Sequence, residues 1–387
     1  MHKQTLPVPV DGPPVLACGA WLKNAACLLE DDQVHWSPVH GDLGDPQSCL
    51  DLDASLQRLL AATRQPLRAV AHDLHPDFYS TQRALAVAAQ LQVPSLAVQH
   101  HHAHIGALMA EHGLNEPVLG LALDGVGLGS DGAAWGGELL WVAPQAWCRL
   151  GHLWPLALPG GDIAAREPWR LVAAALHLLG RAAEIPARLG PLVGERSANT
   201  VALMLERQLN CPLSTGAGRW FDVAAGILGL SVRQDFEAEA AMALEKLASE
   251  YLTEHCAPAV SGLWSITAES VLDLRPLLSR LFDLADQGRS AQGAALFHLT
   301  LAAALADWVA HGRRSLPVAL GGGCFANRLL SRLLTQHLKA RGLQVYSAQA
   351  VSCGDAGLAV GQAWVASHWP DLAHSIALPL EEPPPCA

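Results

Sequence analysis

The sequence has 387 residues, of which 51% are hydrophobic and 16% are charged, so the chain can bury a large core and is not expected to be disordered. Its formal net charge of −11 excludes a general surface for a phosphate backbone, and we expect no nucleic-acid partner. Nine cysteines with no C-x-x-C pair exclude a zinc ribbon, a thioredoxin-type site and an iron–sulfur cluster. Their odd number fits a cytoplasmic protein, and the lack of a signal peptide or a long apolar run predicts no membrane association.

The first 115 residues are expected to form an arm and one α/β lobe. Residues 1–14 are rich in proline and predict an N-terminal arm. The patterns that follow predict two strands about a turn at 15–29, a third strand at 34–39, a helix at 50–63, a strand at 66–71, a helix at 80–90 and a strand at 95–98. This order is that of an α/β lobe, which we place at 15–115.

One lysine stands at the first turn of this lobe. Gly19 and Lys23 bracket the turn between the first two strands. A lysine at such a turn can reach an anion such as a phosphate. The alternative is a lysine that only faces solvent, and this residue by itself favours that alternative.

A run of histidines ends the lobe, where the last strand leads into an expected helix. His100 and His104 are four residues apart, so in a helix they lie on one face, one turn apart. Two imidazoles so placed can hold a divalent metal. The alternative is that the histidines cap the end of the strand and bond to backbone. His101 and His102 have no assigned role: they lie either beside the ligands or in the core.

A second lobe is expected at 116–370. Its first strand, 118–123, ends at Asp124 and is followed by a glycine-rich turn and a strand at 133–142. A dinucleotide-binding fingerprint needs a helix after its glycines, so the strand that follows this G-x-G-x-G excludes a Rossmann fold. An aspartate before a glycine-rich hairpin is instead how two-lobed sugar-kinase and actin-like folds approach nucleotide phosphates and metal.

Two small-residue loops open helices in a helical insertion expected at about 160–312. The first contains Gly160, Gly161 and Asp162, and the second contains Gly218. The free N–H groups at a helix start can bind anions, although most such loops are ordinary helix caps.

The last part of the lobe returns to a strand at 317–320. Glycines 322 and 323 follow this strand and allow a ligand to approach the backbone closely, and Asn327 precedes a helix at 328–341. Asp355 opens a further helix at 358–366, either as its N-cap or as a carboxylate ligand. Residues 371–387 are expected to be a tail, loose from 381 onward.

Together these segments resemble the C-terminal part of HypF-type carbamoyltransferases. The resemblance covers about residues 15–367, in motifs at 22–24, 73–76, 98–104, 124–138, 159–170, 322–330 and 355–359. The sequence departs from the family pattern at Val126, Cys324, Ala326 and Gly354, which stand where Thr, Val, Gln and Asn are usual.

The resemblance implies a fold and a set of site residues. The fold is a two-lobed α/β architecture of the acetate kinase/Hsp70/actin type, Kae1-like, with a ligand site between the lobes. The implied metal is Fe²⁺, or alternatively Zn²⁺, held by His100, His104 and Asp355, with Asp124 as a fourth ligand or as a neighbour of the metal. Lys23 is an implied catalytic residue, and the implied phosphate- and nucleotide-binding residues are Lys23, Asn24, Gly127, Gly160, Gly161, Asp162, Gly218, Gly322, Gly323 and Asn327.

The resemblance also implies an activity. HypF uses carbamoyl phosphate and ATP to form carbamoyl adenylate, then moves the carbamoyl group to the C-terminal Cys thiol of HypE for the cyanide ligand of [NiFe] hydrogenase. We expect a short form without the acylphosphatase, zinc and YrdC-like parts. Two alternatives stay open: a carbamoyl phosphate hydrolase that uses water as acceptor, and a non-catalytic nucleotide-binding scaffold for HypE. The acidic charge disfavours a Kae1-like role in tRNA modification.

Overall fold

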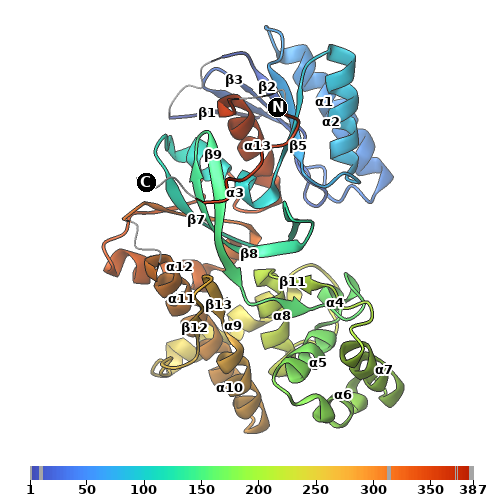
Figure 1. The fold of residues 1–387 in the computed structure, drawn as a ribbon, viewed down its shortest axis with the longest axis vertical. Helices are drawn as coiled ribbons and strands as arrows, with labels where there is room; N and C mark the ends of the chain where they lie inside the picture. The colour runs from blue at the N-terminus through green and yellow to red at the C-terminus, as the bar shows by residue number, and fades with distance from the viewer. Residues whose placement is uncertain (1, 8–11, 312–314, 371, 373, 383–387) are drawn as a thin grey trace.

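Two β-sheets and the helices around them form the protein (Figure 1). The computed structural model describes residues 2–7, 12–311, 315–370, 372 and 374–382. The first sheet has the order β1-β4-β3-β2-β5-β6. Its strands are β1 (His2–Thr5), β2 (Val15–Ala17), β3 (Cys27–Glu30), β4 (Gln33–Trp36), β5 (Ala69–Asp73) and β6 (Ser95–Val98). Strands β2, β5 and β6 are parallel to one another.

The second sheet has the order β12-β13-β9-β8-β7-β14-β15, with β10 and β11 off this path. Its strands are β7 (Val118–Leu128), β8 (Ala134–Ala143), β9 (Ala146–Leu153), β10 (Leu156–Ala157), β11 (Leu213–Ser214), β12 (Ser265–Ile266), β13 (Val271–Asp273), β14 (Val318–Gly321) and β15 (Val345–Ser347). Strand β14 runs parallel to β7 and β15.

The helices form three groups. Two belong to the first lobe, α1 (Pro46–Ala62) and α2 (Tyr79–Leu91), and two are central, α3 (His100–His112) and α13 (Leu358–His368). The third group is α4 (Ile163–Arg166), α5 (Pro168–Leu178), α6 (Ile185–Val193), α7 (Glu195–Glu206), α8 (Ala217–Ile227), α9 (Glu239–Glu254), α10 (Arg275–Asp286), α11 (Ser290–His311) and α12 (Arg328–Ala340). Short 3-10 turns are η1 (Ala182–Glu184), η2 (Gly323–Ala326) and η3 (Asp355–Gly357).

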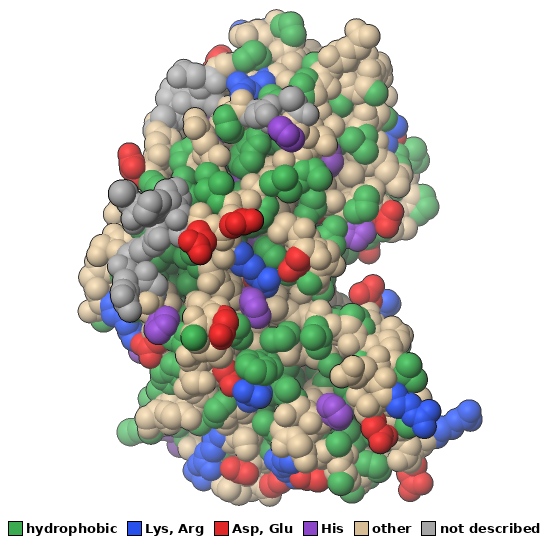
Figure 2. Space-filling model, viewed as in Figure 1, with side chains coloured by type: hydrophobic (Ala, Val, Ile, Leu, Met, Phe, Trp, Pro, Cys, Tyr) green, Lys and Arg blue, Asp and Glu red, His purple; other side chains and the backbone are tan. Residues whose placement is uncertain are grey.

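These elements stack as layers. Helices α1 and α2 cover the outer face of the first sheet, and α3 and α13 fill the space between the two sheets. The third group of helices covers the far side of the second sheet. In the view of Figure 2, the surface is hollowed on one side between the first lobe and this helical part. The predicted two-lobed α/β fold is confirmed.

The two central helices pack unusually closely because glycines face each other. A Cβ atom added at Gly361 of α13 would lie 1.7 Å from the carbonyl oxygen of Ala103, and one at Gly106 of α3 would lie 3.2 Å from the carbonyl oxygen of Gly361. Helix α3 is buried on nearly all its sides, as expected of a helix between two sheets. The helix that follows Asp355 therefore supports the helix that carries the histidines.

Helix α11 is the one helix among the described residues that is long and apolar enough to span a membrane. However, 83% of its apolar window is buried inside the protein. This burial is that of a core helix.

Two terminal predictions need correction. The expected arm contains strand β1, which pairs with β4 at the edge of the first sheet; residues 8–11 of the arm lie outside the described part. The tail is partly docked, because Ile376 bridges Ala97 and the indole N–H of Trp147 donates to the carbonyl of Ala377. Residues 383–387 lie outside the described part.

The helical insertion also contains strands β11, β12 and β13, which complete the second sheet.

Candidate functional site

Four side chains meet where parallel strands of both sheets end. His100 and His104 lie in the first two turns of α3, directly after β6, and Asp124 lies on β7. Asp355 begins η3, ahead of α13. Ligand sites of open α/β sheets lie outside the carboxyl ends of the strands, so this is where the fold favours a site. We call these four residues the His–Asp cluster.

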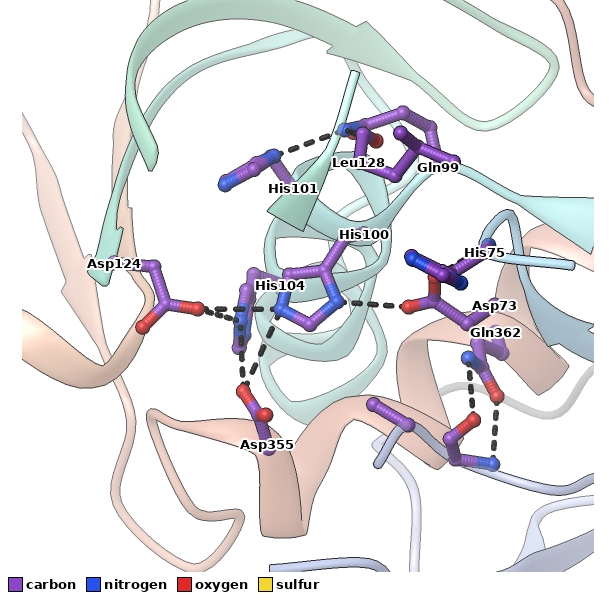
Figure 3. Close-up of polar contacts among 12 residues, drawn as sticks. Asp73, His75, Gln99, His100, His101, His104, Asp124, Leu128, Asp355 and Gln362 are labelled. Carbon is purple, nitrogen blue, oxygen red and sulfur yellow. Dashed lines mark hydrogen bonds and ion pairs between the residues drawn. The ribbon is translucent and has the colours of Figure 1, made fainter. Parts of the chain in front are cut away.

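The distances within the His–Asp cluster suit a metal ion (Figure 3). Asp124 Oδ2 lies 3.2 Å from His100 Nε2 and 3.3 Å from His104 Nε2. Asp355 Oδ1 lies 3.5 Å from His100 Nε2 and 3.6 Å from His104 Nε2. One ligand atom from each of the four residues lies within 4.8 Å of the others. Two imidazoles and two carboxylates are a donor set that Fe²⁺ and Zn²⁺ both accept.

Asp73 orients one of the two imidazoles. Its Oδ2 lies 2.8 Å from His100 Nδ1, and its Oδ1 accepts the N–H of His75 (Figure 3). Both side chains of the Asp73–His100 pair are almost fully buried. With the Nδ1 proton held by a carboxylate, His100 presents the lone pair of Nε2 to the cluster. Asp73 was not predicted as a site residue, although its motif at 73–76 was part of the family resemblance.

The electrostatics of the His–Asp cluster favour a cation. Burial alone would lower the pKa of His100, but the carboxylates of Asp73, Asp355 and Asp124 outweigh it and raise this pKa well above its ordinary value. The pKa of His104 is raised against the effect of burial by hydrogen bonds to Asp124 and Asp355. Burial would raise the pKa of Asp124, yet the two histidines hold it well below its ordinary value. Protons on the imidazoles thus balance the carboxylates, and a divalent cation can replace those protons.

We expect Asp73→Asn to weaken metal binding about 10- to 100-fold, the usual effect of losing such an orienting carboxylate. The amide can donate to Nδ1 and so favour the tautomer that carries its proton on Nε2, where the metal lone pair is needed. Competition with a chelator of known affinity measures the change. The matched control is Asp77→Asn at an exposed position of the same loop. Equal affinities in the two variants would contradict the role of Asp73.

His101 and His102 are core residues in this structure. Gln99 caps α3 by accepting the N–H of His102, and its amide lies 2.9 Å from His101 Nδ1. The ring of His102 stacks on Trp147, and burial lowers the pKa of His102 to about 3. The cap is Gln99 and not a histidine, and within the described residues neither nitrogen of the His102 ring has a hydrogen-bond partner. Of the two positions that the sequence left open, His101 and His102 thus occupy the core, while His100 and His104 face the cluster.

Glycines allow the backbone to pack around Asp124. The N–H of Gly323 lies 3.3 Å from Asp124 Oδ1, and a Cβ at Gly322 would lie 2.3 Å from the carbonyl oxygen of Leu123. A Cβ at Gly127 would lie 2.8 Å from the rings of His100 and His101. Gly218 lies in the first turn of α8, where an added Cβ would lie 3.0 Å from Gly125 Cα. These four predicted glycines border the cluster, and a role in binding substrate stays a prediction.

The predicted lysine lies between the lobes. Lys23 has a φ of +46°, and its Nζ lies 2.9 Å from Glu237 Oε2 of the second lobe. Partial burial would lower the pKa of Lys23, but the ion pair with Glu237 and the fields of Asp355 and Asp124 raise it. Lys23 thus lies in the electrostatic field of two residues of the His–Asp cluster, and its catalytic role stays a prediction. Its neighbour Asn24 is fully buried.

Asn24 supports the turn that carries Lys23. Its Nδ2 donates to the carbonyls of Cys18 and Ala20, and its Oδ1 lies 2.8 Å from His40 Nδ1. The backbone of Gly19 exchanges two hydrogen bonds with the side chain of Gln362 on α13. The side-chain amide of Asn24 thus has its hydrogen-bond partners within the protein, at Cys18, Ala20 and His40.

Other residues predicted to bind substrate have their hydrogen-bond partners outside the His–Asp cluster. The N–H of Gly160 donates to Asn210, and Asp162 begins α4 beside Gly161 on the surface of the helical part. Asn327 caps α12 by accepting the N–H of Leu330, and its Nδ2 lies 3.0 Å from His298 Nε2. Within the described residues, no hydrogen bond or ion pair joins these segments to the cluster.

The burial of His298, the partner of Asn327, predicts a pH effect on stability. Burial lowers the pKa of His298 to about 4, so the folded protein keeps this ring neutral while the unfolded chain takes up a proton below about pH 6.5. The unfolded state then binds more protons, and the free energy of unfolding falls as the pH falls towards 4.

His298→Gln is expected to have a lower free energy of unfolding than the wild type at pH 8. We expect this difference between the two proteins to become smaller in acid. The difference should decrease by about 1.4 kcal/mol per pH unit between roughly pH 6 and 4.5, because glutamine cannot take up the proton. Urea unfolding at several pH values measures it. A deficit that stays constant with pH would show that His298 is not held neutral.

Family models match most of the chain. Residues 10–111 match "HypF Kae1-like domain", and residues 120–362 match "Carbamoyltransferase, Kae1-like Domain, second subdomain". A protein of Cupriavidus necator named carbamoyltransferase HypF homolog is 62% identical over 396 residues, with both chains covered completely. Carbamoyltransferase HypF of Rhizobium leguminosarum is 40% identical over 366 residues, which are 92% of this chain and 46% of that protein.

Solved structures of HypF have the same fold. Full-length HypF in the phosphate- and nucleotide-bound form gives a TM-score of 0.82 at 30% identity, over 94% of this chain and 47% of that one. HypF of T. kodakarensis gives a TM-score of 0.85 at 29% identity, over 95% of this chain and 48% of that one. The chain thus spans the whole of one relative and about half the length of the others. The matches show that this chain belongs to the HypF carbamoyltransferase family, with the Kae1-like two-lobed α/β fold that its sequence predicts.

Proposed function

We propose that this chain transfers a carbamoyl group, derived from carbamoyl phosphate, to the C-terminal Cys thiol of HypE in the cytoplasm, as a step of [NiFe] hydrogenase maturation. The observation that carries the proposal is the His–Asp cluster, built from three separate segments, α3, β7 and η3, in a HypF-family chain. Buried free thiols such as Cys18 and Cys27 fit a reducing compartment.

The His–Asp cluster would hold one divalent cation, Fe²⁺ or Zn²⁺. When bound, such an ion supplies a Lewis acid next to the carbamoyl group or its phosphate. Asp73 keeps the lone pair of His100 Nε2 directed into the cluster, and the N–H of Gly323 fixes the carboxylate of Asp124. These contacts hold the ligand atoms in place before the substrate arrives.

Lys23 would supply positive charge for the phosphate. In this structure Lys23 is paired with Glu237, and both side chains are 58% exposed, so the pair is weak and exchangeable. A phosphate dianion near the cluster can replace Glu237 as the partner of Lys23. The thiolate of HypE then attacks the carbamoyl carbon, a C–S bond forms, and the leaving phosphate takes the electron pair of the broken C–O bond.

A nucleotide is a further proposed ligand. One solved HypF relative is described as phosphate- and nucleotide-bound. If the donor is carbamoyl adenylate, the leaving group is AMP and ATP is needed to form the donor. We propose that a YrdC-like partner supplies the adenylate in that case.

The test follows the acceptor and the donor together. The purified chain is incubated with Fe²⁺ or Zn²⁺, carbamoyl phosphate and HypE, with and without ATP and a YrdC-like domain, and the mass of HypE and the released phosphate and pyrophosphate are measured. We expect HypE to gain one carbamoyl group, and HypE without its C-terminal Cys to gain none.

Two results would overturn transfer. Phosphate release without ATP or HypE, and with no carbamoylated HypE in any arm, would identify a carbamoyl phosphate hydrolase. No turnover in any arm, with HypE still bound, would leave a scaffold.

A further inference from the structure

A second positive charge lies next to the His–Asp cluster, on α8. The first turn of this helix packs against the backbone that follows Asp124: a Cβ at Gly216 would lie 2.3 Å from the carbonyl oxygen of Gly125, and one at Gly218 would lie 3.0 Å from Gly125 Cα. A Cβ at Gly125 itself would lie 3.8 Å from Nη2 of Arg219. The guanidinium group of Arg219 is therefore beside the residue that follows a cluster ligand.

The protein holds this guanidinium group in place. Arg219 Nη2 lies 2.9 Å from Asp222 Oδ2, one turn further along α8, and the Asp222 side chain is 3% exposed. Gln234 Nε2 donates to Asp222 Oδ1, and Gln234 also bonds to the carbonyl of Ala165 and the N–H of Ala240. An arginine fixed in this way loses little freedom when it binds an anion.

Not all N–H donors of Arg219 have an acceptor within the described residues. A guanidinium group carries five N–H donors, and the one protein acceptor that it meets among the described residues is Asp222. Its Nε is buried and has no hydrogen-bond partner within the described part of the chain. The side chain is 14% exposed, so the group is not closed off from a ligand. Its field also reaches the Cys324 thiol, which lies in the field of Asp124 as well.

We propose that Arg219 is a phosphate-binding residue, which meets a phosphate dianion beside the Asp124–Gly125 turn from the second lobe, and that Asp222 is its positioning residue. The inference rests on the proposed function, because that function brings a phosphate to the cluster. Lys23 belongs to the first lobe and Arg219 to the second, so the two cations would meet the anion from different lobes. The phosphate belongs either to carbamoyl phosphate or to a nucleotide, and the chemistry of recognition is the same.

Binding of two probes tests the proposal without any turnover. Calorimetry measures the affinity of the metal-loaded protein for inorganic phosphate and for ADP. We expect Arg219→Gln to weaken at least one of them about 10- to 100-fold, the usual effect of losing a charge-assisted hydrogen bond. Loss for inorganic phosphate assigns Arg219 to carbamoyl phosphate, and loss for ADP alone assigns it to the nucleotide. Arg280→Gln is the matched control, because Arg280 is an exposed residue of α10 that faces Asp283 at 3.9 Å.

A second variant keeps the test independent of folding. Arg219→Gln leaves the buried carboxylate of Asp222 without its cation, which destabilises the protein. The double variant Arg219→Gln/Asp222→Asn removes both charges, and a melting temperature equal to that of the wild type shows that it is folded. A folded double variant that binds phosphate and ADP as tightly as the wild type would overturn the proposal. If Arg219→Gln weakens phosphate binding while the wild-type protein carries out no carbamoyl transfer, the proposed function is refuted and the role of Arg219 stands.

Discussion

Replacing His104 by alanine is expected to abolish metal binding and carbamoyl transfer together. His104 Nε2 faces both Asp124 and Asp355, and its side chain is 2% exposed, so solvent cannot easily supply a replacement ligand. A bound Lewis acid contributes several kcal/mol to such a reaction, so the transfer rate should fall by roughly a hundredfold or more. Metal content by mass spectrometry and carbamoylation of HypE are measured on the same sample.

The control for this variant lies on the same helix. His112 ends α3, where its Nε2 lies 2.9 Å from the carbonyl oxygen of Ser347. His112→Ala should keep both its metal and its activity. A metal-free His104→Ala protein with full activity would refute the metal-dependent mechanism.

Gly361→Ala should unfold or strongly destabilise the protein. The added methyl group would lie 1.7 Å from the carbonyl oxygen of Ala103 and 2.8 Å from the nitrogen of Ala107, and backbone atoms cannot move aside as a flexible side chain can. Overpacking commonly costs about 1–3 kcal/mol, and we expect about 3 kcal/mol or more because α3 and α13 must separate. Urea unfolding measures the loss in the free energy of unfolding.

The same substitution should also weaken metal binding, because α3 carries both histidines and Asp355 begins the segment that leads into α13. Gly190→Ala is the matched control: it lies in helix α6, and its nearest contact would be an ordinary 3.6 Å from Glu195 Cγ. That control should change stability by less than about 1 kcal/mol. Equal free energies of unfolding for the two variants would show that the close packing of α3 and α13 is not needed for stability.

The order of strands and helices was largely predictable from the sequence because their patterns are local. The apolar runs before Asp124 and before Gly322 predicted the strands β7 and β14, and the strand that follows the glycine-rich turn after Asp124 excluded a Rossmann fold. Strand β1 was missed because the prolines that follow it dominate the segment and its partner β4 lies far along the chain. Strands β12 and β13 are short, so no periodicity identifies them between helices.

Two kinds of signal predicted the residues of the His–Asp cluster. The spacing of His100 and His104 is a local signal, whereas Asp124 and Asp355 joined them only through the family resemblance, because the fold alone brings these distant segments together. Nor can a sequence tell which polar groups the protein itself uses. Asn24 was expected at the substrate, but its amide braces the turn around Lys23.

Asp73 and Glu237 were missed because a sequence does not show which distant segments come into contact. Asp73 reaches His100 from strand β5, and Glu237 reaches Lys23 from the other lobe. Both contacts depend on how the lobes and sheets pack, so neither has a signature in the local pattern. The resemblance named the motif of Asp73 but not its role, and only the geometry identifies its partner.

Anomalous X-ray scattering from crystals grown with Fe²⁺ or Zn²⁺ locates the bound metal ion. The function proposed here depends on one metal ion held by His100, His104, Asp124 and Asp355. We predict a single strong anomalous peak within coordination distance of both histidine Nε2 atoms and of a carboxylate oxygen from each aspartate. A fully active protein with no peak there, or with its metal bound elsewhere, would contradict the account.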